Sequence, residues 1–279
     1  MPEGPEIHGQ ALRLKSFLQG QRPQIVGHYP PVVDGLKALE GQLLQQVQAR
    51  GKAFLLTFES GVTLYAHMQL YGRWLISKST EPPKSNRTLR LSLSTPKQTA
   101  WLYSATDIEL LSPQQVEAHP YLRKLGPDLL DPQVNGIELL QRLQDPRFQR
   151  RQLATLLLDQ GFWAGPGNYL RSEILFCAGL SPQTRPCDLS LGQAQRLVQV
   201  AQGLAIRSLH TKGITNHPDI VAQQKQAKVP RRLYRHWVFG RQGQKCWICQ
   251  TPIGKEEWGG RRLYRCYGCV DHGLELTRW

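Results

Sequence analysis

The chain has 279 residues, of which 40% are hydrophobic and 20% charged. This composition can fill one large core or several small ones, so wholesale disorder is excluded. No run approaches the roughly 18 uninterrupted apolar residues of a membrane span, and the first residues lack the basic and apolar regions of a secretory leader. We therefore expect no membrane association and a cytoplasmic location. The net charge of +14 favours a polyanionic partner, and nucleic acid is the commonest polyanion in a cell.

The chain opens with Met-Pro-Glu-Gly-Pro-Glu, and apolar residues then recur at Ile7, Ala11, Leu14 and Leu18. This spacing places the four side chains on one face of a helix. A proline and a carboxylate suit its first turn, because proline lacks no needed donor there and the carboxylate meets the positive end of the helix dipole. From these residues alone, the opening either caps the helix or serves a function at the N-terminus.

After this helix the apolar pattern changes to a period of two, which is typical of β-strands. Thr88–Ser94 alternates strictly between polar and apolar residues, and Glu59–Gly61 predicts a hairpin turn. Many short strands with little helix between them indicate an antiparallel sandwich or barrel up to about residue 112. The other predicted strands are Lys52–Phe58, Val62–His67, Arg73–Ile76, Thr99–Tyr103 and Asp107–Leu111.

The rest of the chain is predicted to be mainly helical, after a short helix within His119–Leu130. Asp-Pro pairs at 131–132 and 145–146 mark a boundary. Leucines then recur at helical spacing from residue 153, and Gly161–Gly167 interrupts the pattern. Further helices are predicted at Tyr169–Phe176, Leu191–Leu209 and Asp219–Ala227, with a basic connector at Lys225–Arg235.

Four of the six cysteines form two C-x2-C pairs separated by sixteen residues. Each pair directs two thiolates inward from one tight turn, and two such turns complete a tetrahedron around a metal. We therefore predict one structural zinc ion, since four thiolates leave no open position for catalysis. Cys177 and Cys187 are interpreted as buried or incidental thiols. The predicted ligands are Cys246, Cys249, Cys266 and Cys269.

Three further segments precede these cysteines in a fixed order: PEGPEI at the start, RGKAFLL at 50–56 and LLDQGFWAGPGNYLRSEIL at 157–175. Together the four features resemble the bifunctional DNA glycosylases of the formamidopyrimidine-DNA glycosylase and endonuclease VIII type. The resemblance spans almost the whole chain. His67–Gly72 and Tyr103–Glu109 are more similar to the endonuclease VIII branch.

The resemblance implies an α+β multidomain fold with three parts. These are an N-terminal antiparallel β-sandwich with its leading helix, a helix–two-turn–helix module and a C-terminal zinc ribbon built on a β-hairpin. We predict a catalytic domain at 1–130, a linker at 131–148, the DNA-binding module with its basic connector at 149–235, and the zinc ribbon with a tail at 236–279.

The resemblance also gives the opening residues a catalytic role. Removal of Met1 exposes the secondary amine of Pro2, and an α-amino group has a reference pKa of about 8, so a useful fraction is uncharged near neutral pH. Attack of this amine on the sugar C1′ expels the damaged base and leaves an iminium ion that draws electrons during strand cleavage. Glu3 is assigned to proton transfers, and Glu6 to a supporting electrostatic role.

Lys52 follows a glycine and by itself is typical of a solvated turn residue. The resemblance instead implies a catalytic residue that lies against the phosphate and sugar of the substrate, near the cleavage chemistry. Gln69, Leu70 and Tyr71 end a predicted strand, where an apolar and aromatic trio either packs in the core or acts on a ligand. The resemblance implies that this trio enters the void left by an extruded base and offsets the lost stacking.

Three other residues are implied to contact the DNA backbone. Asn168 precedes a predicted helix, where it either caps the helix or binds a phosphate at the helix N-terminus. At position 124 the sequence has lysine where the endonuclease VIII pattern has arginine. Lys124 keeps the positive charge but lacks the planar guanidinium that can donate two parallel hydrogen bonds to one phosphate. Arg261, preferred to Arg262, lies five residues before Cys266 and is expected to grip phosphates flanking the lesion. The resemblance also assigns Arg261 to the catalytic residues, as required for processing of the damaged base or for the later elimination.

We therefore predict a monomeric, bacterial enzyme of base excision repair that acts on double-stranded DNA with a damaged base or an abasic site. It is expected to remove oxidised bases, preferentially pyrimidines, through a Pro2 Schiff base and to cut the strand by β,δ-elimination. The alternatives are 8-oxoguanine specificity within the same family and a zinc-ribbon DNA-binding protein without catalysis. The tail Val270–Trp279 receives no function.

Overall fold

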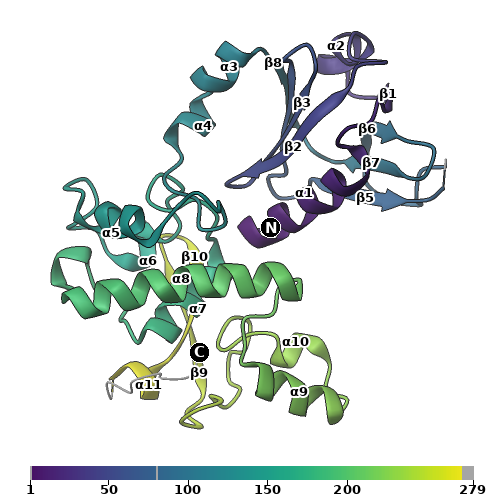
Figure 1. Cartoon of the computed structure of the whole chain (residues 1–279). Coiled ribbons are helices and arrows are strands. Elements are labelled where there is room, and N and C mark those ends of the chain that lie inside the picture. Colours follow the sequence, from purple (N-terminus) through teal and green to yellow (C-terminus); the bar gives the residue numbers. More distant parts are fainter. Residues whose placement is uncertain (1, 80, 272–279) are drawn as a thin grey trace. The chain divides into compact units, whose positions relative to one another are not determined.

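The computed structural model describes residues 2–79 and 81–271, which divide into two compact units. Unit 1 covers residues 1–124 and unit 2 covers residues 125–279 (Figure 1). None of the described helices combines the length and the apolar character needed to cross a membrane. From residue 272 onward, the tail that the sequence analysis left without a function lies outside the described residues.

Unit 1 begins with helix α1, Gly4–Leu18, as the apolar spacing predicts. Its buried face consists of Ile7, Ala11, Leu14 and Leu18, so this prediction is confirmed. Pro5 occupies the first turn, and the N-terminal end is closed by a capping box between the residues at positions 3 and 6. The apolar face packs against strand β2, which fixes the start of the chain on the sheets.

The described residues of unit 1 form two four-stranded antiparallel sheets, in the orders β1-β6-β7-β5 and β2-β3-β4-β8. The predicted sandwich is thereby confirmed. The six predicted strands all occur, each within one residue at either end, whereas two further strands and three short helices among the described residues of this unit were not predicted. The strands are β1 Gln24–Gly27, β2 Leu44–Arg50, β3 Ala53–Phe58, β4 Thr63–His67, β5 Arg73–Ser77, β6 Leu89–Ser94, β7 Thr99–Tyr103 and β8 Asp107–Leu111. Short helices η1 (Pro30–Val32), α2 (Val33–Lys37), α3 (Pro113–Ala118) and α4 (Pro120–Lys124) complete this unit.

Unit 2 is built around helix α7, Asn168–Ala178, whose residues after Asn168 are all buried. This helix packs against α8 and against strand β10 of the C-terminal hairpin. The helical part and the cysteine-bearing hairpin therefore share one core, which contains Leu170, Leu263 and Cys266. The helices are α5 Gly136–Gln144, α6 Leu153–Leu156, η2 Pro186–Asp188, α8 Leu191–Thr211, α9 Pro218–Gln226, α10 Arg231–Tyr234 and α11 Tyr267–Asp271, and the hairpin strands are β9 Ile253–Trp258 and β10 Arg261–Cys266.

Helix α5 lies within residues 131–148, which the sequence analysis assigns to a linker. Its Leu139 and Leu143 are buried in the core of unit 2, so this stretch is folded against the helices that follow it. The side chain of Asn135 caps α5 by accepting hydrogen bonds from the Ile137 and Glu138 N–H groups at 2.9 and 3.0 Å.

Candidate active site

The start of helix α1 borders a small cavity in unit 1. The cavity is lined by Pro2, Ile7, Lys52, His67, Met68 and Gln69. The cavity therefore brings together residues from three separate segments: the N-terminus, the β2–β3 turn and the end of β4. Three of them, Pro2, Lys52 and Gln69, are residues that the sequence analysis assigns to the site.

Glu3 lies at the N-terminal end of α1 and is only 3% exposed. It forms a capping box with Glu6, in which the Glu3 N–H donates to Glu6 Oε2 at 3.0 Å. The two roles predicted for the opening residues, helix capping and catalysis, are therefore compatible, because Glu3 caps the helix and also lies next to Pro2. The positive end of the helix dipole stabilises a carboxylate at this position.

Lys52 lies in the turn between β2 and β3, where Gly51 has a φ of 59°. Its residue exposure is 8%, so it is not the solvated turn residue that the local sequence alone favours. The Lys52 N–H donates to the Tyr121 hydroxyl at 2.9 Å, which joins the turn to helix α4. The lysine is thus held beside the cavity by a residue 69 positions away in sequence.

His67 is a residue of this cavity that the sequence analysis did not select. Burial, with a smaller contribution from the charge of Lys52, lowers its pKa to about 4, so the imidazole is neutral near pH 7. Its Nδ1 accepts the Gln69 N–H at 3.3 Å, which leaves the ring proton on Nε2. The ring packs against Tyr121, and Asp107 Oδ2 lies 3.9 Å from Nδ1. A histidine at the end of a strand, two residues before Gln69, was the available signal.

The buried neutral state of His67 predicts a pH dependence of stability. Its folded-state pKa of about 4 lies below the ordinary value of 6.5, so unfolding takes up a proton between these limits. The stabilisation that the neutral His67 contributes is therefore fully present above about pH 6.5. It is lost as the pH falls towards 4, by at most about 1.4 kcal/mol of unfolding free energy per pH unit. Urea unfolding at pH 7.5 and pH 5 is expected to show a larger loss for the wild type than for His67→Gln.

The glutamine is a matched control because it cannot titrate and can still accept the Gln69 N–H. His236, whose pKa burial also lowers, is present in both proteins and cancels in the comparison. An equal loss of stability in both proteins at pH 5 would show that His67 is not a buried neutral group.

Gln69, Leu70 and Tyr71 form the loop between β4 and β5. Leu70 is 58% exposed and Tyr71 is 68% exposed, so neither packs in the core. The loop is closed by the Gly72 N–H, which donates to the Met68 carbonyl at 2.8 Å. A Cβ on Gly72 would lie 2.7 Å from that carbonyl oxygen, so this tight closure requires glycine. The loop therefore presents two large apolar side chains to solvent.

Lys124 ends α4 and is exposed, while the remaining predicted residues belong to unit 2. Asn168 is the first residue of α7, and Gly167 occupies the N-cap position, so Asn168 does not cap this helix. The alternative in which Asn168 serves as the N-cap is therefore excluded, and its contact with the DNA backbone stays a prediction. The helix start is set instead by the extended backbone of Gly167, and the Asn168 carbonyl accepts a hydrogen bond from Ser172 Oγ at 2.9 Å.

Arg261 begins β10, directly after the hairpin tip formed by Gly259 and Gly260, and is exposed. The hairpin predicted for the sixteen-residue spacer is confirmed. In the antiparallel register Arg262 lies opposite Glu257, whereas Arg261 lies opposite Trp258. Because the acidic neighbour faces Arg262, this register favours Arg261 as the residue available to an external anion.

The hairpin tip is held by Arg171, a second residue that the sequence analysis did not select. This side chain is fully buried in α7 and donates from Nη2 to the Arg262 carbonyl at 2.9 Å and from Nη1 to the Ala154 carbonyl at 2.9 Å. A buried arginine therefore joins the helical part of unit 2 to the strand that carries Arg261. Its partners Ala154 and Arg262 are far away in sequence, so only the fold reveals the role.

Glu173, two residues further along α7, is also fully buried. Its carboxylate accepts hydrogen bonds from Thr215 Oγ1 and from the N–H groups of Trp237, Val238 and Phe239, the latter at 2.8 to 2.9 Å. These bonds tie the chain before the first cysteine pair to the centre of the unit. The buried carboxylate is thus fully engaged in structure.

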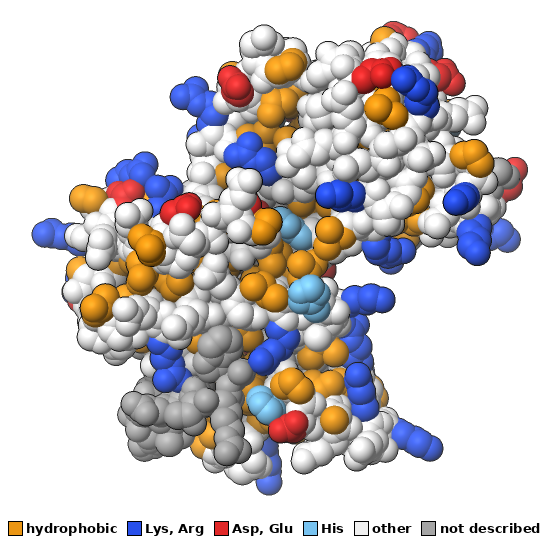
Figure 2. All heavy atoms as spheres, in the orientation of Figure 1, with side chains coloured by type: hydrophobic (Ala, Val, Ile, Leu, Met, Phe, Trp, Pro, Cys, Tyr) orange, Lys and Arg blue, Asp and Glu red, His pale blue; other side chains and the backbone are white. Residues whose placement is uncertain are grey.

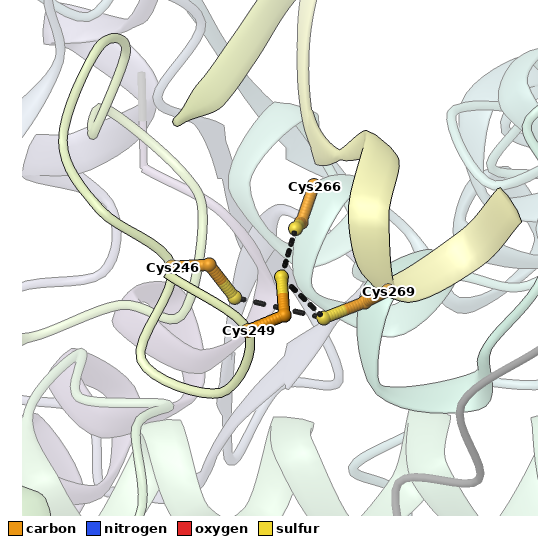
Figure 3. A group of neighbouring side chains, drawn as sticks. All are labelled: Cys246, Cys249, Cys266 and Cys269. Atoms are coloured by element: carbon orange, nitrogen blue, oxygen red, sulfur yellow. Dashed lines mark hydrogen bonds between the residues drawn. The ribbon is translucent and has the colours of Figure 1, made fainter. Parts of the chain in front are cut away.

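The four predicted cysteines converge at the base of the hairpin (Figure 3). Their sulfur atoms all lie within 4.8 Å of one another, and three of the pairs are 3.3 to 3.6 Å apart. Tetrahedral zinc with Zn–S bonds of about 2.3 Å needs sulfur separations of about 3.8 Å. A Cβ on Gly268 would lie 2.5 Å from Thr251 Oγ1 and 3.0 Å from Cys249 Sγ, so the second turn also needs its glycine. This set of donors fits one four-coordinate metal ion.

Comparison with known proteins agrees with this arrangement. Residues 1–106 match the formamidopyrimidine-DNA glycosylase N-terminal domain, and residues 125–219 match the formamidopyrimidine-DNA glycosylase H2TH domain. Endonuclease 8 of Escherichia coli is 41% identical over 270 residues, which cover 96% of this chain and 99% of that protein. Endonuclease 8 of Shigella flexneri is 40% identical, with the same coverage.

Two solved structures share the fold. Lactococcus lactis Fpg (MutM) in complex with a Fapy-dG containing DNA has a TM-score of 0.76 and 21% identity, over 95% of this chain and 98% of that chain. Lactococcus lactis Fpg in complex with an abasic site containing DNA has a TM-score of 0.75 and 21% identity, over 96% and 98%.

The fold, the N-terminal cavity and these relatives define a DNA glycosylase with AP lyase activity that works in base excision repair. The chain belongs to the formamidopyrimidine-DNA glycosylase family. The family and the fold class predicted from the sequence are confirmed, and the family match argues against a non-catalytic zinc-ribbon protein.

Proposed function

We propose that this chain removes oxidised pyrimidines from double-stranded DNA through a Schiff base on Pro2 and then cuts the strand on both sides of the sugar. The proposal is supported by the cavity at the start of α1, which Pro2 and Lys52 line together. A secondary amine at the N-terminus is a nucleophile near neutral pH, and the lysine beside it can bind a phosphate or sugar oxygen.

In the proposed mechanism the Pro2 nitrogen attacks C1′ of the damaged nucleotide. The bond between C1′ and the base breaks, the base leaves with the electron pair and takes up a proton, and the Pro2 nitrogen loses its N–H proton. Glu3 donates a proton to the ring oxygen, so the sugar opens and an iminium ion forms between Pro2 and C1′. Loss of a C2′ proton then breaks the C3′–O bond in β-elimination, and a second elimination breaks the C5′–O bond. Water finally hydrolyses the imine and releases the enzyme.

Borohydride trapping tests this proposal directly. The reductant converts an iminium ion into a stable amine, so the wild-type protein is expected to become covalently linked to DNA with an abasic site. Peptide mapping by mass spectrometry should locate the cross-link at the N-terminal residue. A cross-link at any lysine, or no cross-link at all, would contradict the Pro2 mechanism.

The proposed lesion preference is based on the loop Gln69–Tyr71 and on the Endonuclease 8 relatives. A wedge that replaces lost stacking lengthens the life of the extruded state without identifying the base, so this loop supports a pyrimidine preference only through its resemblance to the endonuclease VIII branch. We therefore expect faster excision of thymine glycol or dihydrouracil opposite purines than of 8-oxoguanine opposite cytosine. Single-turnover rates on duplexes that differ only in the lesion measure this, and a clear preference for 8-oxoguanine would favour the alternative specificity.

Double-stranded DNA is the proposed partner, and the charge of the chain supports it. On the face drawn in Figure 2, Lys and Arg side chains predominate over Asp and Glu side chains. With a net charge of +14, binding is expected to weaken steeply as salt is added. The residues proposed for backbone contact are Lys124, Asn168 and Arg261. One chain supplies all of the residues proposed to contact DNA. We therefore propose a monomer that acts at the bacterial nucleoid.

We further propose that the four cysteines hold one structural zinc ion. The convergence of four sulfur atoms from two C-x2-C turns supports this assignment. Such an ion supplies folding free energy and closes its own coordination shell, so the reaction is left to the residues of the N-terminal cavity. The metal would fix the base of the hairpin that carries Arg261.

A further inference from the structure

The loop Met68–Gly72 holds a conformation that its own sequence does not favour. Gln69 has a φ of 46°, in the left-handed region that favours glycine. The same loop exposes Leu70 and Tyr71, whose apolar surfaces would gain by collapsing onto the sheet. Contacts from outside the loop must therefore stabilise this exposed conformation, and two of them come from residues without an assigned role.

The first contact comes from Thr106, the residue before β8. Thr106 Oγ1 donates to Gln69 Oε1 at 2.9 Å. Asp107, the next residue, is the register partner of His67, so Thr106 lies beside the end of β4 by the geometry of the sheet. The Tyr29 hydroxyl donates to the Thr106 carbonyl at 3.1 Å and holds it from the other side. Gln69 is thus bound at its side chain by Thr106 and at its N–H by His67 Nδ1.

The second contact comes from Arg87, which precedes β6. Its guanidinium donates to the carbonyl of Tyr71, and its own N–H is bound by Ser85 Oγ at 3.1 Å. The loop is therefore held at Gln69 by Thr106, just before β8, and at Tyr71 by Arg87, just before β6. Leu70, between these two points, has its side chain left in solvent.

We propose that Thr106 and Arg87 are positioning residues that hold the loop Gln69–Tyr71 ready for insertion into DNA. This inference rests on the proposed wedge role of the loop. A loop ordered before binding loses less conformational entropy on insertion, so more of the stacking free energy is available to stabilise the extruded base. Neither Thr106 nor Arg87 is proposed to touch the reacting atoms.

Thr106→Val tests the first contact, because it keeps the side-chain shape and removes the hydroxyl. Loss of one exposed hydrogen bond is expected to slow excision of thymine glycol from duplex about two- to tenfold. Cleavage at a preformed abasic site, where no base is extruded, should keep the wild-type rate. Thr106→Ser retains the hydroxyl and should restore excision. An unchanged rate for Thr106→Val, or equal slowing on both substrates, would overturn the assignment of Thr106.

A double-mutant cycle separates this inference from the proposed function. Leu70→Ala alone should slow excision more than abasic-site cleavage, and Thr106→Val should add no further slowing in that background. If Leu70→Ala slows both substrates equally, the wedge role itself fails. If Leu70→Ala behaves as expected but the two effects simply add, the wedge role stands and the positioning role of Thr106 is overturned.

Arg87→Gln tests the second contact, with salt dependence as the discriminating measurement. A positioning residue is expected to slow excision from duplex selectively and to leave the slope of log affinity against log salt unchanged. A residue that binds a DNA phosphate would instead reduce that slope by about one. Such a reduction would reassign Arg87 to the DNA backbone.

Discussion

Replacing Pro2 with glycine is expected to reduce borohydride trapping on abasic-site DNA at least about tenfold, which corresponds to about 1.4 kcal/mol of transition-state stabilisation. The variant keeps an N-terminal amine, but a primary one, which forms an imine that must be protonated before it can draw electrons. The secondary amine of proline gives a permanently cationic iminium ion instead. Pro2 also lines the cavity beside α1, so removal of its ring would change the wall of that cavity.

Lys52 provides the comparison that makes this experiment decisive. It lines the same cavity and is the other amine in position to form an imine. Mass spectrometry must first establish that Met1 has been removed from each protein. If Pro2→Gly traps as well as the wild type while Lys52→Ala does not trap, the nucleophile is Lys52. Circular dichroism and zinc content, unchanged in Pro2→Gly, would show that the lost trapping is not lost folding.

The elements of unit 1 that could be predicted from sequence are those with an unbroken pattern. Helix α1 buries one face at regular spacing, β6 alternates between polar and apolar residues, and β3, β4 and β7 are short, nearly continuous apolar runs. Strand β2 was missed because its pairing with β3 shifts register between Leu44 and Gln46, and this irregularity breaks the period of two. Strand β1 has only four residues and is defined by its pairing with β6.

The residues of the candidate site also differ in how far they could be predicted from the sequence. Pro2, Lys52 and the cysteines belong to short motifs with fixed spacing, so a sequence can reveal them. His67, Arg171 and Glu173 depend on partners that the fold brings from far along the chain, and Arg171 reaches a carbonyl 91 residues away. A single sequence contains the two ends of such a contact but not their proximity. Helix α5 was missed for a related reason, because two Asp-Pro pairs flank it and resemble a linker.

Replacing Cys249 with serine is expected to remove zinc from a protein that otherwise binds about one ion per chain. A serine hydroxyl is a poor zinc ligand, and metal binding at such a site is largely folding free energy, about 10 to 16 kcal/mol in zinc-finger peptides. The loss should extend beyond the hairpin, because Cys246, Cys266 and Cys269 belong to the core that also contains Leu170 of α7. Unit 1 has its own core and should be unaffected.

Cys187→Ser is the matched control, since Cys187 is an exposed cysteine outside the cluster and should keep both the zinc and the stability of the wild type. Elemental analysis gives the metal content, and hydrogen exchange followed by mass spectrometry locates the change. Faster exchange is expected in β9, β10 and the N-terminal half of α7, where Arg171 and Ser172 bond to β10, with unchanged exchange in the sheets of unit 1. Because the hairpin carries Arg261, lesion excision should fall along with the metal. The proposed zinc site would be contradicted if freshly purified wild-type protein contained no zinc. Full zinc content and unchanged exchange in Cys249→Ser would contradict it as well.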